Sequence, residues 1–304
     1  MTIRGCFGSI ESSSRLEKRI FVMTIKDIII KYSDKLKDIS DTPRLDTELL
    51  LQKTLGVDRL YIHLNLNKEL TEEQKTKFMG FAEERLNGRP IAYIVENREF
   101  MGLDFFVKEG VLIPRPDTET LVEEIIEICR EKKDVSILDI GTGSGAITIS
   151  LAKYVENSKI MSFDISETAL EIAKKNAIIN EVGEKIKYIN SDLFTAISDS
   201  NIKFDIIVSN PPYIKKQDIE TLHKQVKDYE PYNALEGGED GLDFYRRITE
   251  QGKKYLNKCG ILAYEVGHNQ AEDVINIMKS NGYKKIYTKK DIQGIDRVVI
   301  GYNI

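Results

Sequence analysis

The residues best suited to chemistry are Asn210-Pro211-Pro212-Tyr213, which directly follow the apolar run 204–209. A conjugated amino group is a poor nucleophile, because its lone pair is delocalised, and it carries two N–H donors. The Asn210 side-chain oxygen and the Pro211 backbone oxygen could accept one hydrogen bond each, aiming the lone pair at an electrophilic methyl group and stabilising the developing positive charge. Two consecutive prolines stiffen the segment, and Tyr213 could stack on a planar amide or base. We therefore predict Asn210, Pro211 and Tyr213 as catalytic, in preference to a plain double-proline turn. All four residues of the segment are predicted to bind the substrate, and Asn210 is also predicted to border the cofactor.

A glycine-rich turn directly follows the apolar run 135–140. Its glycines allow a tight turn and the close approach of a ligand. A dinucleotide fingerprint, G-x-G-x-x-G, would need glycine where Ala146 stands, so this G-x-G-x-G spacing favours S-adenosylmethionine over a dinucleotide with its pyrophosphate. The predicted cofactor-binding residues of this turn are Gly141, Thr142, Gly143, Ser144 and Gly145.

Two acidic residues follow later apolar runs. Asp164 lies 23 positions after Gly141 (164 − 141), a distance at which an acid can accept hydrogen bonds from both ribose hydroxyls. The alternative is that Asp164 caps a helix that begins near Ser166. Asp192 could accept a hydrogen bond from an adenine amino group while Leu193 packs on the ring, although Asp192 could also simply form a turn.

These residues need a framework of strands and helices. From residue 135 onward a strand, a turn and a helix alternate, which predicts an α/β fold with a parallel sheet covered on both faces. Ligands of such sheets bind beyond the carboxyl ends of the strands. Upstream, Thr42-Pro43 and the capping box Thr71–Gln74 predict helices. The alternating, aromatic-rich pattern of Tyr93, Phe100, Leu103, Phe105 and Val107 around Gly102 predicts a β-hairpin.

Four segments follow from these patterns: an extension (1–22), a helical domain (23–88), a β-hairpin linker (89–110) and an α/β domain (111–304). Residues 1–22 show no periodicity and no signal-peptide pattern. The sequence Met23-Thr24-Ile25-Lys26 also echoes Met1-Thr2-Ile3-Arg4. We therefore expect residues 1–22 to be dispensable for activity.

Composition narrows the function classes. The 304 residues carry a formal net charge of −5, whereas proteins that grip nucleic acid through its phosphates are usually basic. We interpret Lys215-Lys216 and Lys289-Lys290 as solvated surface lysines rather than as a basic patch that binds nucleic acid. The three cysteines and three histidines are scattered, so we expect neither disulfides nor a metal site. A reducing, cytoplasmic setting without a membrane span is the expectation.

From residue 24 to residue 302 the chain resembles the peptide chain release factor glutamine methyltransferases (HemK/PrmC type), which are class I S-adenosylmethionine-dependent methyltransferases. The resemblance implies a Rossmann-like, seven-stranded methyltransferase domain, in which residues 296–301 form an antiparallel last strand, and a small N-terminal helical domain joined to it by a β-hairpin. The matching segments are Arg44–Leu50, Val111–Glu119, the glycine turn, Asn210–Tyr213 and Ala234–Leu242.

The resemblance also implies roles. Residues 141–145 would hold the methionine part of the cofactor, Asp164 the ribose, and Asp192 with Leu193 the adenine. Residues 210–213 would bind the glutamine of the Gly-Gly-Gln loop in class-1 release factors, Arg115 and Glu119 would border the pocket, and the helical domain would recognise the release factor. The chain departs from the family at Val95-Glu96, where a glycine-containing turn is common, and at Leu193, where some members have tryptophan.

Three alternatives remain open. Adenine and guanine N-methyltransferases share the Asn-Pro-Pro-Tyr segment, but they should carry a basic face or a target-recognition domain, and a pocket for a flipped base. A protein that binds S-adenosylmethionine without catalysis would not need an intact Asn-Pro-Pro-Tyr segment. A nicotinamide oxidoreductase is disfavoured by the glycine spacing.

Overall fold

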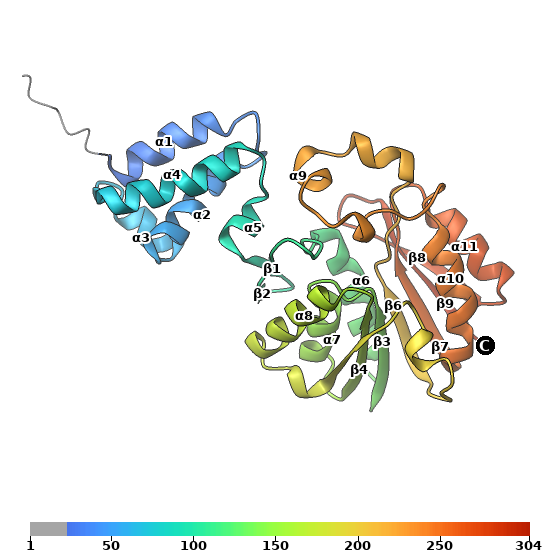
Figure 1. Cartoon of the computed structure of the whole chain (residues 1–304). Coiled ribbons are helices and arrows are strands. Elements are labelled where there is room, and N and C mark those ends of the chain that lie inside the picture. Colours follow the sequence, from blue (N-terminus) through green and yellow to red (C-terminus); the bar gives the residue numbers. More distant parts are fainter. Residues whose placement is uncertain (1–22) are drawn as a thin grey trace, which may run out of the picture. The chain divides into compact units, whose positions relative to one another are not determined.

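The computed structural model describes residues 23–304, so the predicted extension lies outside the described residues. The chain divides into two compact units, one ending at Gly80 and one beginning at Phe81 (Figure 1). Over residues 23–80 the first unit contains three helices and the start of a fourth, which continues to Leu86. These are α1 (Ile25–Lys35), α2 (Pro43–Leu55), α3 (Arg59–Leu64) and α4 (Glu72–Leu86).

Local signals explain where these helices begin and end. Thr71 Oγ1 accepts the Gln74 amide while the Gln74 side chain accepts the Thr71 amide, which confirms the predicted capping box. Pro43 is the first residue of α2, and Gly56 ends that helix in the left-handed conformation (φ +67°). Buried aliphatic and aromatic side chains join the helices, among them Ile25, Ile28, Leu50, Leu51, Ile62 and Phe78.

In the second unit the end of α4 is followed by a short helix and a hairpin. The hairpin expected around Gly102 is confirmed for β1 (Arg98–Phe100) and β2 (Leu103–Phe105), which pair antiparallel. Extending it back to Tyr93 was wrong, because residues Ile91–Val95 form helix α5. Pro90 stands at the N-cap of that helix, and its C-cap is Glu96, at φ +59°.

A seven-stranded sheet dominates the second unit, in the order β5-β4-β3-β6-β7-β9-β8. Strands β3 to β7 run parallel to one another, whereas β9 lies antiparallel between β7 and β8, as expected for the last strand. The strands are β3 (Val135–Ile140), β4 (Ser158–Asp164), β5 (Ile186–Asn190), β6 (Phe204–Ser209), β7 (Leu256–Glu265), β8 (Lys284–Lys290) and β9 (Asp296–Asn303). The main helices are α6 (Pro116–Cys129), α7 (Ala146–Tyr154), α8 (Glu167–Ile179), α9 (Lys224–Lys227), α10 (Asp243–Gly252) and α11 (Ala271–Ser280).

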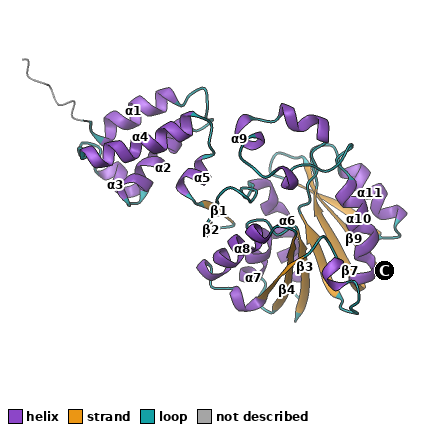
Figure 2. Ribbon diagram, in the orientation of Figure 1, coloured by secondary structure: helices purple, strands orange, loops and turns teal. Residues whose placement is uncertain are grey.

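Helices cover both faces of the sheet (Figure 2). Alternate strand residues point to opposite faces, so Ile137 packs in the cluster with α6 and α7, whereas Leu138 packs in the cluster with α10 and α11. Both residues are fully buried. Two-sided burial explains the nearly continuous apolar runs of the central strands and confirms the predicted α/β class.

Strand order determines where a ligand can bind. From β3 the chain adds β4 and β5 on one side, and later places β6 on the other side of β3. The connections after β3 and β6 therefore diverge at the carboxyl edge of the sheet and leave a crevice. The glycine turn and the Asn-Pro-Pro-Tyr segment both start at this edge.

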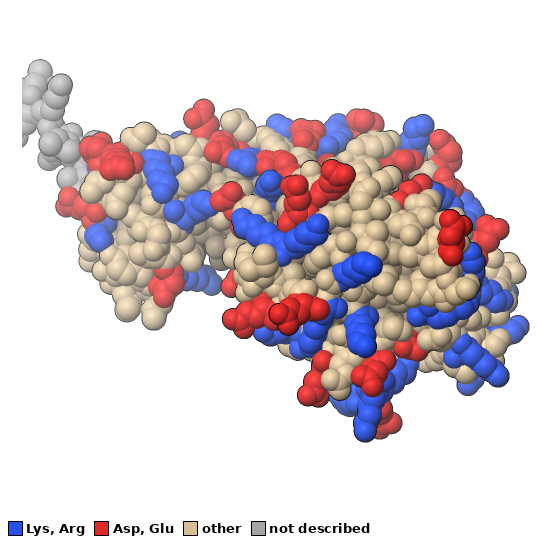
Figure 3. Space-filling model, turned by 60° about the horizontal axis from the view of Figure 1, so that its bottom comes forward, with Lys and Arg blue, Asp and Glu red and all other residues tan. Residues whose placement is uncertain are grey.

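The surface carries both charges. On the face drawn in Figure 3, Lys and Arg side chains are interspersed with Asp and Glu side chains. Within residues 23–304, no helix combines the length and apolarity needed to cross a membrane.

Candidate active site

A cavity of about 310 Å³ lies at the carboxyl edge of the sheet. It brings together residues that follow three strands: Gly141 and Gly143 after β3, Asp164 at the end of β4, and Asn210 after β6. Further lining residues include Pro211, Pro212, Asp192 and Leu193 from the predicted set, and Val111, Phe163, Ala169, Pro231, Asn233, Phe244, Arg247 and Ile248.

Some residues of the glycine turn face the cavity, and the others lie beneath it and support the turn. Gly141 and Gly143 line the cavity, whereas Thr142, Ser144 and Gly145 do not, and Thr142 and Ser144 are buried. A Cβ on Gly145 would lie 2.7 Å from Ile149 Cδ1, and its φ is +86°. This glycine therefore allows α7 to start close beneath the turn.

Asp164 is held by backbone amides. Its carboxylate accepts hydrogen bonds from the Gly143 and Ser166 N–H groups, each at 2.8 Å. Burial raises the pKa of Asp164, and these amides oppose that shift. The cap of α8 is Ser166, whose Oγ accepts the Ala169 amide at 3.2 Å, so the alternative role of Asp164 as the helix cap was wrong.

Asp192 and Leu193 also line the cavity. Arg247 of α10 donates to both Asp192 carboxylate oxygens, at 3.0 and 3.2 Å. The Leu193 backbone is left-handed, at φ +48°. This wall thus combines an apolar side chain with an acid held by an arginine.

The Asn-Pro-Pro-Tyr segment faces the cavity with its first three residues. Asn210 Nδ2 donates to Thr118 Oγ1 of α6 at 3.3 Å. Tyr213 is not among the cavity-lining residues and packs against the cluster that contains α10 and α11. Burial raises the pKa of the Tyr213 phenol above its ordinary range, so this side chain is neutral near pH 7.

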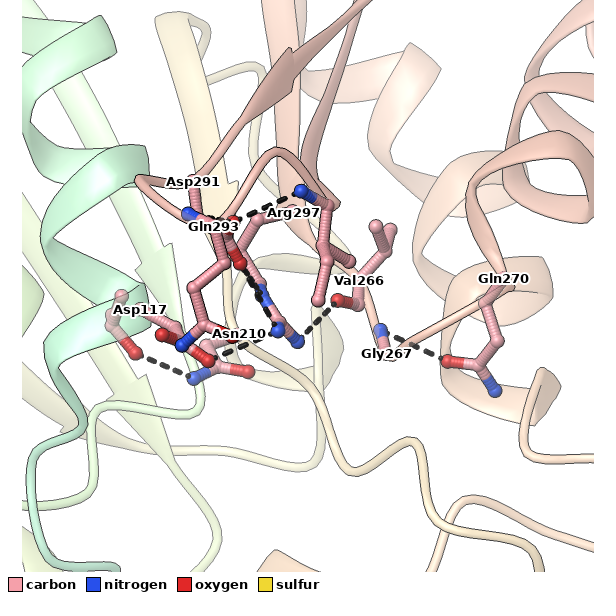
Figure 4. Close-up of polar contacts among 10 residues, drawn as sticks. Asp117, Asn210, Val266, Gly267, Gln270, Asp291, Gln293 and Arg297 are labelled. Carbon is pink, nitrogen blue, oxygen red and sulfur yellow. Dashed lines mark hydrogen bonds and ion pairs between the residues drawn. The ribbon is translucent and has the colours of Figure 1, made fainter.

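Three later residues hold the Asn-Pro-Pro-Tyr backbone. Gln270 Nε2 donates to the Tyr213 carbonyl at 3.0 Å and to the Gly241 carbonyl at 3.2 Å. The Gln270 Oε1 accepts the Gly267 amide at 3.1 Å (Figure 4). A Cβ on Gly237 would lie 2.6 Å from the Pro212 oxygen, and one on Gly241 2.4 Å from the Tyr213 oxygen. The glycines thus let a second loop pack directly on the segment.

Arg115 and Glu119 lie outside the set of lining residues. Arg115 forms an ion pair with the buried Glu230, which precedes the lining residue Pro231 and also accepts the Ile113 amide at 3.3 Å. Glu119 accepts the Met101 amide at 2.8 Å and so contacts the hairpin. The structure thus connects Arg115 to the cavity wall through Glu230, and it does not bring Glu119 to the wall.

Arg297 of β9 lies close to Asn210, although it does not line the cavity (Figure 4). Its guanidinium lies 3.0 Å from Asp117 Oδ2 and 3.3 Å from Asp291 Oδ2, and it donates to the Val266 carbonyl at 3.4 Å. Asp117 belongs to the segment Val111–Glu119, so this arginine joins that segment to the end of the sheet.

Sequence reasoning missed most of the outer wall. These lining residues lie in the connection before α10 and in α10 itself, where the sequence contains no recognisable motif. They are Pro231, Asn233, Phe244, Arg247 and Ile248. The one feature of the sequence that could have indicated these residues is that they lie close in the chain to Ala234–Leu242, a segment that matches the family but carries no predicted role.

Comparisons with known proteins agree with this geometry. Residues 27–95 match the PrmC N-terminal domain, and residues 116–228 match the Methyltransferase small domain. The release factor glutamine methyltransferase of Clostridium acetobutylicum is 44% identical over 279 residues, covering 91% of this chain and 98% of its own length. The protein of that name from Fusobacterium nucleatum subsp. nucleatum is 43% identical over 286 residues, covering 93% and 80%.

One solved structure supports the fold alone. The hMettl16 catalytic domain in complex with the MAT2A 3′UTR hairpin 6 is 15% identical, covers 78% of this chain and 85% of its own, and has a TM-score of 0.54. At this identity the similarity extends to the arrangement of helices and strands.

Proposed function

Since the chain belongs to the release factor glutamine methyltransferase family, we propose that it methylates the side-chain nitrogen (N5) of the glutamine in the Gly-Gly-Gln loop of class-1 peptide chain release factors. The methyl donor is S-adenosylmethionine, and the reaction serves translation termination in the cytoplasm. One observation carries the proposal: the glycine turn, Asp164 and the first three residues of Asn-Pro-Pro-Tyr line one cavity.

The residues that line the cavity have the chemical groups needed to bind S-adenosylmethionine. Asp164 supplies a carboxylate for the ribose diol, and its two amide partners leave lone pairs on both oxygens. Asp192 offers an acceptor for the adenine amino group beside apolar Leu193 and Ile248. Gly141 and Gly143 give backbone access for the methionine part. When bound, the cofactor supplies an electrophilic methyl group on a sulfonium.

The Asn-Pro-Pro-Tyr segment would orient the substrate. Asn210 Oδ1 and the Pro211 carbonyl accept the two N–H bonds of the glutamine amide, which aims the nitrogen lone pair into the cavity. Both acceptors also stabilise the positive charge that develops on nitrogen. The new N–C bond would form as the bond between the methyl group and the sulfonium sulfur breaks, which would leave S-adenosylhomocysteine. No strong base would be needed, because the N–H proton becomes acidic only as the N–C bond forms and can then be lost to solvent.

Substrate class separates this proposal from nucleic-acid methylation. An exocyclic amine of adenine or guanine presents the same two donors, so Asn210 does not discriminate. The net charge of −5 and the mixed charges in Figure 3 favour a protein substrate over a polyphosphate. We propose that the helical N-terminal domain recognises the release factor, and that Arg115 supports the pocket through Glu230.

A methylation assay by mass spectrometry tests the proposal. The protein and S-adenosylmethionine are incubated with an unmodified class-1 release factor, and in parallel with bulk RNA and DNA. We expect one methyl group on the Gly-Gly-Gln glutamine, absent when that glutamine is replaced by alanine. Methylation of nucleic acid alone would contradict the protein substrate and would support the alternative.

A further inference from the structure

Glu265, the last residue of β7, is a buried carboxyl group next to the Asn-Pro-Pro-Tyr segment. Its exposed fraction is 1%, and its Oε2 finds no hydrogen-bond partner among residues 23–304. Burial raises the pKa of Glu265 to about 7, although hydrogen bonds from the Thr118 and Asn210 side chains lower it. A buried carboxyl group with incomplete partners costs stability, so its presence here calls for a function.

In its hydrogen bonds the Glu265 carboxylate is the acceptor. An ionised carboxylate only accepts hydrogen bonds, so Thr118 and Asn210 must donate to it. Thr118 Oγ1 can then accept from Asn210 Nδ2, the contact of 3.3 Å that the structure contains. Both hydrogens of the Asn210 amide are thus directed toward α6 and β7.

Among residues 23–304, these hydrogen bonds leave the opposite end of the amide, Asn210 Oδ1, free. The two ends of an asparagine amide have nearly the same shape, so only hydrogen bonds determine which end faces which way. With its nitrogen held by Thr118 and Glu265, Asn210 presents Oδ1 on the other side. In the reverse orientation its NH2 would face the NH2 of the substrate, and one of the two acceptors would be lost.

We propose that Glu265 is a positioning residue that, acting with Thr118, holds the Asn210 amide with its oxygen toward the substrate amide. This inference rests on the proposed function, because only a substrate with two N–H donors requires that orientation. Glu265 acts through Asn210 and does not line the cavity.

Orientation then depends on the ionisation of Glu265. The titratable and charged groups that face it are Arg297 of β9, Asp117 of α6, Tyr213 and Tyr245. Burial raises the pKa of both tyrosines above the ordinary value, so they stay neutral near pH 7. Above pH 7 the Glu265 carboxylate accepts from Asn210; below it, the carboxylic acid can donate to Asn210 Oδ1 and stabilise the reversed amide. Turnover should therefore fall as the pH falls through about 7.

Steady-state kinetics of the full-length chain with the release factor test this role. In Glu265→Gln the carboxamide can donate to Asn210 Oδ1 at any pH, so we expect kcat to fall about 10- to 100-fold and the decline below pH 7 to disappear. Thr118→Val should lower kcat similarly, and Thr118→Ser, which keeps the hydroxyl, should restore most of it. KM for the release factor and Kd for S-adenosylmethionine should stay within about threefold, because neither Glu265 nor Thr118 lines the cavity.

A matched control is Asp205→Asn. Asp205 lies near the start of β6, at the end of the strand opposite Asn210, and its carboxylate binds Ser136 and Asn257. This variant should keep both kcat and the pH profile, and calorimetric cofactor binding verifies that each variant is folded.

The outcomes separate the two proposals. A wild-type enzyme that methylates only nucleic acid counts against the proposed substrate, and the variants are then compared on that exocyclic amine, which presents the same donors. Wild-type kcat in Glu265→Gln, with the decline below pH 7 intact, overturns the positioning role and leaves the proposed function untouched. An equal loss of kcat in Thr118→Ser and Thr118→Val also overturns it.

Discussion

Asn210 and Asp164 line one cavity but face different ligands in the proposed function. Asn210 offers an acceptor to the substrate amino group, where charge develops during the reaction. Asp164 offers its carboxylate to the ribose, whose charge does not change. Interactions that strengthen in the transition state raise kcat, whereas interactions that stay constant contribute to binding. Substitutions at the two positions should therefore affect different constants.

Replacing Asn210 by alanine should lower kcat about 100- to 1,000-fold, because one of the two acceptors of the substrate amide disappears. Cofactor affinity should stay within a few-fold. Methyl transfer to the release factor gives kcat, and calorimetry gives Kd. Asn281→Ala, at the end of α11, serves as the control with unchanged kcat. A loss confined to cofactor affinity would contradict the orienting role.

Replacing Asp164 by alanine should weaken S-adenosylmethionine binding about 10- to 100-fold, since hydrogen bonds to a charged acceptor contribute about 1.5–3 kcal/mol each. At saturating cofactor, kcat should be largely retained. Isothermal calorimetry measures the effect, with the exposed Asp199→Ala as the control. Unchanged affinity would mean that the carboxylate only holds the Gly143 and Ser166 amides.

The loop that contains Gly237 and Gly241 packs directly on the Asn-Pro-Pro-Tyr segment and on the residue that follows it. Residues 214 and 236 form a parallel bridge, Gly237 and Gly241 contact the Pro212 and Tyr213 backbone, and Gln270 joins Tyr213 to Gly241. We therefore infer that the loop that covers Asn-Pro-Pro-Tyr adds to the stiffness given by its two prolines.

Gly237→Ala tests this packing. The new Cβ would lie 2.6 Å from the Pro212 oxygen and 2.8 Å from the Tyr213 Cα, so the Asn-Pro-Pro-Tyr backbone must move. We expect a loss of about 1–3 kcal/mol in the free energy of unfolding, measured by chemical denaturation, together with a fall in kcat. In the control Gly183→Ala no atom of residues 23–304 lies within 4 Å of the new Cβ, apart from its chain neighbours. Equal effects of the two substitutions would refute the packing argument.

The chain distributes its tasks over two units. In the described part of the chain, every lining residue of the cavity lies between Gly110 and Ile248, in the second unit. The first unit contains its own ion-pair cluster, in which Glu48, with a fully buried side chain, accepts hydrogen bonds from the exposed Arg44 and Arg59, each at 2.9 Å. We expect damage to the first unit to affect recognition of the release factor and to leave cofactor binding intact.

Glu48→Gln is the corresponding test. Burial raises the pKa of Glu48, but hydrogen bonds from Arg44 and Arg59 and the nearby charges outweigh it, so the net shift is downward. A lowered pKa stabilises the folded state above the pKa of the unfolded chain, and this stabilisation is lost as the pH falls through the folded value.

The variant should therefore lose about 1–3 kcal/mol near pH 7, and its difference from the wild type should shrink in acid. Thermal unfolding from pH 3 to pH 8 measures this, with the exposed Glu73→Gln as the control. Cofactor Kd should stay constant. A weakened cofactor Kd in Glu48→Gln would contradict the division of tasks.

The sequence by itself determined the features that depend on local backbone preferences and on hydrophobic patterning. Glycine spacing, consecutive prolines, the Thr71–Gln74 capping box and the buried strand runs act over a few residues, so the turn, the stiff segment and the α/β class could be predicted. Tyr93 was misassigned to the hairpin because an aromatic pattern alone does not separate a short helix from a strand.

Only the tertiary structure decided what surrounds those motifs. Thr118 and Asn210 are 92 positions apart and Arg247 and Asp192 are 55 apart, yet each pair is in contact. Glu119, which the resemblance associates with the pocket, contacts the hairpin. Such contacts depend on how helices and strands that are distant in the sequence pack at one sheet edge. The residue types within one segment do not predict that packing. The wall of the cavity and the carboxyl group behind Asn210 are therefore properties of the fold.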